Sequence, residues 1–122
     1  ITKFETKPYK KTGQPVIIGG SMETGSYLLV GSEKAMQETF GSTAHGSGRV
    51  MSRTKAKHEI RGDVLQKQML AKGIYVKTAS FSGLAEEAGF AYKNISEVVE
   101  AIHNAGLSYR VTGLVPCANI KG

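Results

Sequence analysis

The chain has one cysteine, Cys117, no tryptophan and only three prolines among its 122 residues. A single cysteine cannot form a disulfide within the chain, so we expect a reducing compartment. No apolar run approaches the roughly 18–20 residues that a membrane-spanning helix requires. The amino terminus also lacks the apolar segment of a signal peptide. These absences predict a cytoplasmic protein that does not associate with a membrane.

Acidic residues are the minority charge. Sixteen Lys and Arg residues against ten Asp and Glu residues give a net charge of +6. A positive field favours encounter with polyanions such as RNA, although the same excess also serves solubility. The length and the 40% hydrophobic content are those of one ordinary globular domain. Charge alone therefore does not decide the partner.

Short β-branched runs alternate with capped helical patterns, which predicts a mixed α+β fold of short strands and helices. Strands are expected over 14–18, 26–30 and 74–79, and from Tyr109 to Ile120 with an interruption at Pro116. Helices are expected from Ser32 to Thr39 with Gly41 as the stop, over 50–57, from the capping pair Asp63 and Gln66 to Gly73, and between Asn94 and Gly106. Residues 1–12 are predicted as loop, and 82–92 as a short helix and loop.

The most unusual segment is Gly41-Ser-Thr-Ala-His45-Gly-Ser-Gly48-Arg49. Gly46 and Gly48 permit positive φ, so the N–H groups beside His45 can turn inward as an anion-binding nest. A neutral imidazole is a competent nucleophile toward phosphorus, and it also serves as an acid or base. Alternatively, the histidine simply makes a hydrogen bond to backbone. Residue type alone leaves these roles open.

Two arginines follow the histidine at a spacing of four residues. If the chain is helical from residue 50, Arg49 and Arg53 share one face near the positive end of that helix. A phosphate beside His45 would then meet backbone donors and two guanidinium groups. The phosphate-loop pattern fails, because Ser47 stands where that pattern requires lysine. The dinucleotide fingerprint is also missing.

Several motifs, in this order, resemble the carboxy-terminal motifs of the RtcB family of RNA ligases. They are Gly13-Gln-Pro-Val-Ile-Ile-Gly-Gly-Ser-Met, Gly25-Ser-Tyr, Glu38-Thr-Phe-Gly-Ser-Thr-Ala-His-Gly-Ser-Gly-Arg-Val-Met-Ser-Arg, Glu86-Glu-Ala, Ala91-Tyr-Lys-Asn and Ile120-Lys-Gly. The resemblance runs from about residue 13 to the last residue. It implies that the chain has the fold of the carboxy-terminal part of such a ligase.

The resemblance implies a manganese- and GTP-dependent enzyme that joins RNA 2′,3′-cyclic-phosphate or 3′-phosphate ends to 5′-hydroxyl ends, in tRNA splicing and RNA repair. His45 would accept GMP from GTP, and the GMP would activate the RNA 3′-phosphate for attack by the 5′-hydroxyl. The implied partners are RNA, such as tRNA halves or broken RNA ends, the amino-terminal part of the ligase and an archease-type activator.

The same resemblance implies roles for other residues. Those that would contact the nucleotide are Gly19, Gly20, Ser21, Met22, Ser26, Gly46, Ser47, Gly48, Tyr92 and Lys121. Ser26 would reach the guanine, Lys121 would contact the base, and Tyr92 would stack on it. Arg49 and Arg53 would hold RNA phosphates. On physical grounds alone, a tyrosine such as Tyr92 is more often a core aromatic, and a penultimate lysine is usually frayed.

The family's manganese ligands, a set of histidines with a cysteine and an aspartate, lie in its amino-terminal part. Here the only histidines are His45, His58 and His103, without carboxylates at ligand spacing, so no metal site is expected within the chain. We interpret residues 1–122 as the carboxy-terminal segment of a single catalytic domain without its amino-terminal metal-binding part.

Glu23 departs from the family pattern, which usually has glycine at that place. An inward-pointing carboxylate there would lower nucleotide affinity. Two alternative functions follow from the same sequence. One is a catalytically silent module that binds RNA or nucleotide and lacks the metal centre. The other is an interaction domain in which the basic surface serves only solubility.

Overall fold

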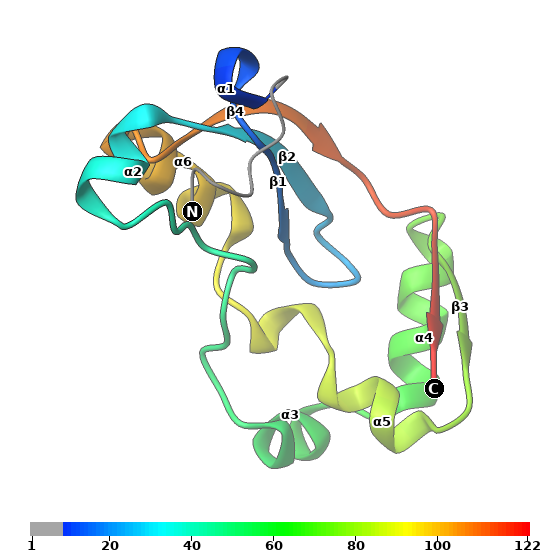
Figure 1. The fold of residues 1–122 in the computed structure, drawn as a ribbon. Helices are drawn as coiled ribbons and strands as arrows, with labels where there is room; N and C mark the ends of the chain where they lie inside the picture. Colours follow the sequence, from blue (N-terminus) through cyan, green and yellow to red (C-terminus); the bar gives the residue numbers. More distant parts are fainter. Residues whose placement is uncertain (1–8) are drawn as a thin grey trace.

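A three-stranded antiparallel sheet forms one half of the structure, a computed structural model that describes residues 9–122 (Figure 1). Its strands β1 (Pro15–Gly19), β2 (Ser26–Gly31) and β4 (Ser108–Leu114) lie in the order β1-β2-β4. Gly19 pairs with Ser26 at the end of the β1–β2 hairpin. The glycine-rich turn over residues 20–25 is therefore held at one end of this sheet.

Helix α6 (Ile95–Ala105) packs on the sheet and forms the first core with it. Its buried members are Ile18, Leu29, Ile95 and Val99. The helix begins after Asn94, whose side chain accepts the Ser96 N–H, and it ends at Gly106, which has φ 73°. The predicted start at Asn94 and the predicted stop at Gly106 are both confirmed. They could be predicted because an Asx cap and a left-handed glycine depend only on neighbouring residues.

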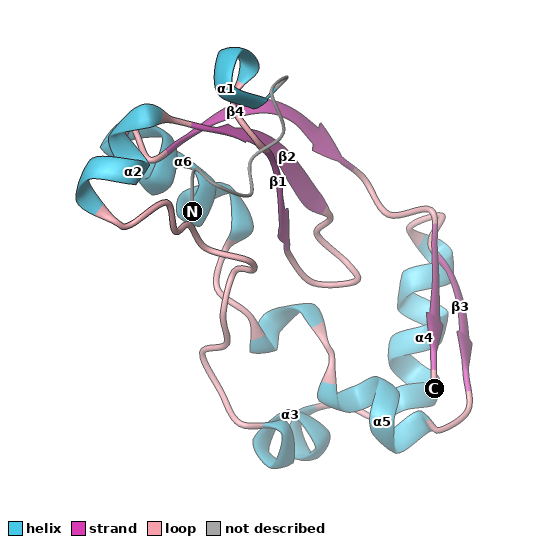
Figure 2. Ribbon diagram, in the orientation of Figure 1, coloured by secondary structure: helices cyan, strands magenta, loops and turns pink. Residues whose placement is uncertain are grey.

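The second half contains α3 (Arg53–Glu59), α4 (Gly62–Ala71), α5 (Phe81–Glu86) and a parallel pair of strands, β3 (Tyr75–Thr78) and β5 (Ala118–Lys121). Figure 2 shows α4 beside the two strands and α3 next to α5, away from the three-stranded sheet. Their core consists of Met22, Leu65, Met69, Ile74, Val76, Leu84 and Ala88. Met22 belongs to the β1–β2 turn, so this turn ties the first half of the molecule to the second.

The strands and the α+β class are confirmed, whereas several helix ends differ from the prediction. Ser32 caps α2 (Glu33–Glu38) as expected, and the helix ends one residue before the predicted Thr39. Gly41, the predicted stop, adopts φ 71° and donates its N–H to Ala35 O. A short helix, α1 (Tyr9–Thr12), occupies part of the predicted amino-terminal loop. The rest of that prediction, residues 1–8, lies outside the described residues.

The predicted capping pair of α4 is wrong. Arg61 precedes the helix without a side-chain cap, and its guanidinium binds the carboxylate of Asp63 instead. Gln66 donates to the carbonyl of Val76 on β3, at 2.9 Å. An ion pair between nearby residues and a contact with β3 therefore replace the predicted capping pattern. Likewise, the segment over 82–92 divides into α5 and the single-turn helix η1 (Gly89–Ala91). None of the helices within residues 9–122 has the length and apolar character of a membrane span.

The close approach of α4 to α5 requires glycine at residue 62. A Cβ built on Gly62 would lie 1.9 Å from the carbonyl oxygen of Phe81. We expect Gly62→Ala to destabilise the protein by about 1–3 kcal/mol, because backbone must move. Gly83→Ala, within α5, is the matched control, since its Cβ would meet only Ser80 atoms at 3.7 Å or more.

The control should stabilise the fold by about 0.5–1 kcal/mol, because alanine favours helix over glycine. Urea unfolding of the two variants measures the difference. Equal effects from both substitutions would contradict the steric argument.

Candidate functional site

The two glycine-rich segments of the predicted site meet through their backbones. Gly19 forms a parallel bridge with Gly46. The Gly19 N–H donates to His45 O at 3.2 Å, and the Ser47 N–H donates to Gly19 O at 2.8 Å. The structure thus brings segments 19–22 and 45–48 side by side, at the edge of the sheet.

The His45 side chain is exposed to solvent. Within residues 9–122 its imidazole has no hydrogen bond or ion pair, so the interpretation as a backbone-bonded histidine is wrong. The nest prediction also needs correction, because the Ser47 N–H is already used by Gly19. Only Gly48 has positive φ, at 75°, while Gly46 is part of the bridge. The His45 imidazole therefore has no hydrogen-bond partner within the described residues. The 46–48 segment also offers fewer unbonded backbone N–H groups than predicted.

Ser47 contributes an unsatisfied polar atom to this segment. The residue is 4% exposed, and its Oγ is the one buried side-chain oxygen or nitrogen without a hydrogen-bond partner in the described part of the chain. Buried polar atoms almost always have a partner in native proteins. The Ser47 hydroxyl, two residues from His45, is therefore a buried polar atom that the described residues leave unsatisfied.

The prediction that Arg49 and Arg53 share a helical face is wrong. Residue 49 forms an isolated bridge with Tyr92, and the Val50 N–H donates to Ala91 O at 2.9 Å. This pairing keeps the chain extended, and Ser52 then caps α3, which begins at Arg53. The two arginines nevertheless converge, because both reach the acidic residues at the carboxyl end of α5, Glu86 and Glu87.

Arg49 is held from several sides. Its guanidinium donates to the Tyr92 hydroxyl at 3.0 Å and to the Glu86 carbonyl at 2.6 Å, while Nε donates to Met51 O at 3.1 Å. The guanidinium carbon also lies 4.7 Å from the centre of the Tyr92 ring. One face of this ring is thus covered, so a base can stack only on the opposite face. Tyr92 is half-buried rather than a core aromatic.

Two adjacent carboxylates, Glu86 and Glu87, collect the nearby cations. Glu87 lies 3.6 Å from Arg49, 3.6 Å from Arg53 and 3.8 Å from Lys121. It also accepts the Tyr92 hydroxyl. Glu86 pairs with Lys57 at 2.5 Å and Arg53 at 3.8 Å. Sequence reasoning assigned no role to these carboxylates, although the Glu86-Glu-Ala motif contained them.

Lys121 is not frayed, which corrects the physical expectation for a penultimate residue. Its backbone belongs to β5, where it pairs with Thr78 of β3, and its carbonyl accepts the Ala79 N–H at 3.0 Å. Its ammonium group reaches Glu87. The same carboxylate therefore connects the carboxy-terminal strand with Tyr92 and both arginines.

The environment shifts two pKa values in this cluster. Burial acts to raise the pKa of Glu87, but the hydrogen bond from Tyr92 and the nearby positive charges outweigh it. The pKa of Glu87 is therefore lowered. For Tyr92, burial and the neighbouring Glu87 carboxylate raise the phenol pKa, and Arg49 offsets only part of this effect.

The turn over residues 20–25 is tightly packed against the rest of the protein. A Cβ on Gly20 would lie 2.2 Å from the Gly25 carbonyl oxygen. Ser21 is buried and its hydroxyl lies 2.9 Å from that of Thr24. Met22 is 7% exposed within the second core. The side chain of Met22 is therefore unavailable to a nucleotide, and only its backbone can serve the predicted contact.

Glu23 does not add an uncompensated charge to that turn. Its carboxylate accepts the Gly89 N–H at 2.5 Å and lies 3.3 Å from Lys72 Nζ. The side chain is 13% exposed. Glu23 thus fastens the turn to η1 and α4, and its charge is balanced by a lysine.

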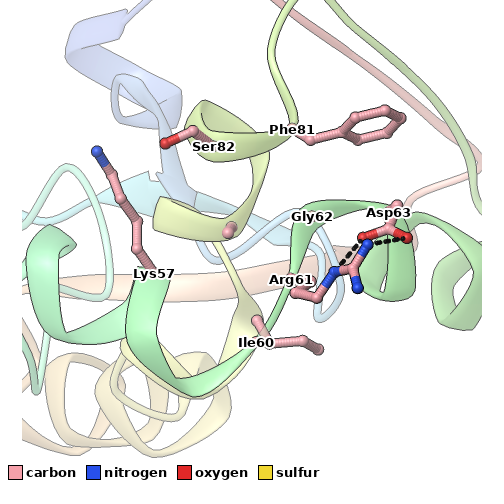
Figure 3. A pocket seen from close by; sticks show the side chains of 8 residues that line it. Lys57, Ile60, Arg61, Gly62, Asp63, Phe81 and Ser82 are labelled. Atoms are coloured by element: carbon pink, nitrogen blue, oxygen red, sulfur yellow. Dashed lines mark hydrogen bonds and ion pairs between the residues drawn. The ribbon is translucent and has the colours of Figure 1, made fainter.

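Neither surface pocket found in the described residues contains His45. One has a volume of about 490 Å³ and lies between α3, α4 and α5, where Lys57, Arg61 and Phe81 line it (Figure 3). Both cations there are already paired, with Glu86 and Asp63 respectively. The other, of about 660 Å³, lies between α1, α2 and β4. His45 is exposed and lines neither of these two pockets.

No group of three or more potential metal ligands exists within residues 9–122. His58 is exposed on α3. His103 accepts the Arg110 N–H through Nδ1 at 3.1 Å and contacts the Tyr109 ring edge-on, which is a structural role. The described residues therefore do not provide a manganese site.

An exposed imidazole, glycine backbone and clustered cations suit the binding of phosphate esters. The family model described as tRNA-splicing ligase RtcB matches residues 2–122, so the chain belongs to the RtcB family. It is 55% identical over 93% of its length to tRNA-splicing ligase RtcB of Archaeoglobus fulgidus, and 50% identical over 95% to that of Pyrococcus abyssi. The chain spans 24% and 13% of these relatives, respectively.

The lowered pKa of Glu87 gives a testable pH dependence. A carboxyl group whose pKa is lowered in the folded protein stabilises the fold at pH values above its ordinary pKa. This contribution disappears as pH falls through the lowered pKa. Tyr92→Phe removes a hydrogen bond that lowers it. We therefore expect the Glu87 pKa to rise and stability at neutral pH to fall by about 1 kcal/mol.

Carboxyl ¹³C NMR titration and urea unfolding measure these two changes. Tyr75→Phe, on an exposed tyrosine of β3, is the control and should alter neither. An unchanged Glu87 pKa in Tyr92→Phe would show that the hydroxyl does not act on this carboxylate.

Proposed function

We propose that this chain is the carboxy-terminal segment of an RNA ligase and that His45 carries GMP during the reaction. The observation that carries the proposal is the exposed His45 imidazole, which has no hydrogen bond or ion pair within residues 9–122, while the His45 backbone carbonyl accepts the Gly19 N–H. Membership in a family described as tRNA-splicing ligases supports the reaction class. The substrates are RNA ends and GTP.

The chemistry assigned to His45 is nucleophilic catalysis. An imidazole nitrogen attacks the α-phosphorus of GTP, a P–N bond forms, and the P–O bond to pyrophosphate breaks with its electron pair on the leaving group. The imidazole proton passes to solvent. The RNA 3′-phosphate then takes GMP from the histidine, and the 5′-hydroxyl displaces GMP as the phosphodiester forms. Three successive displacements thus replace one difficult step.

The nucleotide contacts proposed for this chain rest on residues around His45. The backbone at Gly46 and Gly48 suits an α-phosphate. The unpaired Ser47 hydroxyl is buried, so it would join the proposed contacts only if the 45–48 segment shifts on binding. Lys121 suits a carbonyl oxygen of guanine, and the uncovered face of Tyr92 suits stacking on the base. From the β1–β2 turn, the backbone of residues 19–22 and Ser26 complete the proposed set.

Arg49 and Arg53 are proposed to hold RNA phosphates. Both guanidinium groups lie near the carboxylates of Glu86 or Glu87, so an incoming phosphate must share or replace these acceptors. Arg53 is the more accessible of the two, with a side chain that is 65% exposed against 20% for Arg49. The net charge of +6 supports attraction of RNA to this surface.

Manganese is not assigned to this chain. The described residues contain no cluster that could hold the ion, so its ligands are proposed to come from the amino-terminal part of the ligase. The chain spans 24% and 13% of the two relatives, so the relatives contain further sequence that could supply these ligands. Similarity to the family alone supports the remaining expectations, namely RNA repair, an archease-type activator and a cytoplasmic location.

The amino-terminal part is proposed to pack against the outer strands of the three-stranded sheet. Ile17 on β1 is 65% exposed and Val111 on β4 is 60% exposed. Leu114, at the end of β4, is 49% exposed. Exposed large apolar side chains on both outer strands of one sheet are consistent with a surface that is covered in the complete protein.

The GMP–histidine proposal predicts a covalent label. The full-length protein is incubated with [α-³²P]GTP and manganese, and an acid-labile adduct is sought after denaturing electrophoresis. We expect His45→Ala to abolish the label, because no other nucleophile replaces the imidazole. His58→Ala, at an exposed histidine of α3, is the control and should retain it. A label that persists in His45→Ala would refute the assignment.

The packing proposal predicts unequal effects from two similar substitutions in the full-length protein. Val111→Glu should destabilise it by at least about 2 kcal/mol, because a charge would be buried at the interface. Leu70→Glu, on an exposed position of α4, should change stability by no more than about 0.5 kcal/mol. Thermal unfolding measures both, and a Val111→Glu variant as stable as the control would refute the interface.

A further inference from the structure

We propose that Glu87 is a positioning residue that orders Lys121 and Tyr92 for nucleotide binding. The inference rests on the function proposed above, since it concerns the same site. Glu87 itself would not contact the nucleotide. It would act through the ammonium group and the phenol that its carboxylate holds.

The geometry of Glu87 distinguishes it from the other acidic residues. Its carboxylate receives the Tyr92 hydroxyl and lies within 3.8 Å of Lys121 Nζ. Arg49 and Arg53 also reach it, at 3.6 Å each. These four partners come from four separate segments: the chain after His45, the start of α3, the end of η1 and β5. One carboxylate thus sets the relative positions of side chains distant in sequence.

Lys121 depends on this carboxylate for its order. The strand pairing of β5 with β3 fixes the lysine backbone, but it does not fix the flexible side chain. Within the described residues, the ammonium group of Lys121 forms its ion pair with Glu87. A side chain ordered before the ligand arrives loses less conformational entropy on binding. Loss of this ion pair should therefore weaken ground-state binding of GTP.

Tyr92 depends on Glu87 in a different way. Its hydroxyl donates to Glu87 and accepts from Arg49, so the phenol is held between an anion and a cation. This arrangement fixes the plane of the ring, whose one face Arg49 already covers. The uncovered face is then presented in one orientation, which suits stacking of a base.

Glu86 offers an internal comparison. It is the preceding residue and carries the same charge, but it pairs with Arg53 and Lys57 and contacts neither Lys121 nor Tyr92. Its pairs lie along α3, on the side assigned to RNA phosphates. The two neighbouring carboxylates therefore predict separable effects, with Glu87 acting on the nucleotide and Glu86 on RNA.

The test is the GTP dependence of histidine guanylylation in the full-length protein. We expect Glu87→Gln to raise KM for GTP about tenfold, equivalent to about 1.4 kcal/mol, with kcat changed much less. Glu86→Gln should alter the dependence on RNA ends more than the dependence on GTP. Glu100→Gln, at an exposed position of α6, controls for the loss of one negative charge and should match the unmodified protein.

A double-mutant cycle tests whether Glu87 acts through Lys121. Lys121→Met should raise KM for GTP, and adding Glu87→Gln to it should raise KM by a much smaller factor than in the unmodified background. Fully multiplicative effects would overturn the proposal, as would an unchanged KM in Glu87→Gln or a loss confined to kcat. Thermal unfolding checks that each variant is folded.

If Glu87→Gln does not fold, Glu87→Asp is tested in its place. Aspartate keeps the negative charge, but its side chain is one methylene shorter, so the carboxylate lies farther from Lys121 and Tyr92. A KM raised by a smaller factor would support the proposal, and an unchanged KM would overturn it. NMR titration of Tyr92 adds a local readout, since loss of the carboxylate should lower the phenol pKa. Absence of any guanylylation in the unmodified protein would refute the proposed function itself and is distinct from these outcomes.

Discussion

Balance of charge around Glu86 and Glu87 is the interaction on which the candidate site depends. Four cations converge there, Arg49, Arg53, Lys57 and Lys121, and without the carboxylates they would repel one another. Single exposed ion pairs contribute little to stability. Here the pairs share acceptors, and one of these acceptors also receives the part-buried hydrogen bond from the Tyr92 hydroxyl. The two carboxylates thus add side-chain contacts between segments that the 49–92 bridge and the β3–β5 pairing already bring together.

Local signals in the sequence predicted the regular elements well. Ser32 and Asn94 are capping residues whose side chains bond within three residues, and Gly106 is a left-handed stop. The β-branched runs predicted β1 and β2 because each strand buries alternate residues against α6. Such features require only neighbouring residues, and therefore one sequence is sufficient to find them.

Long-range contacts explain the failures. Residue 49 pairs with Tyr92, 43 residues away, and this pairing delays the helix to Arg53. Gln66 bonds to β3 instead of capping α4. Met22 looked like part of a ligand loop because glycines surround it, yet its side chain fills the second core. Nothing local marks Glu87 as the acceptor for Lys121, since the contact depends on where β5 lies.

The two arginines of the site are not equivalent, which the shared motif concealed. Arg49 is 20% exposed and donates to a carbonyl and a hydroxyl besides its ion pair, so a phosphate would have to replace several good contacts. Arg53 is 65% exposed and has only ion pairs of 3.6–3.8 Å, which water screens. A phosphate therefore gains Arg53 at little cost. Arg49 is better suited to supporting Tyr92. Its positive charge would act on a ligand from the covered side of the Tyr92 ring.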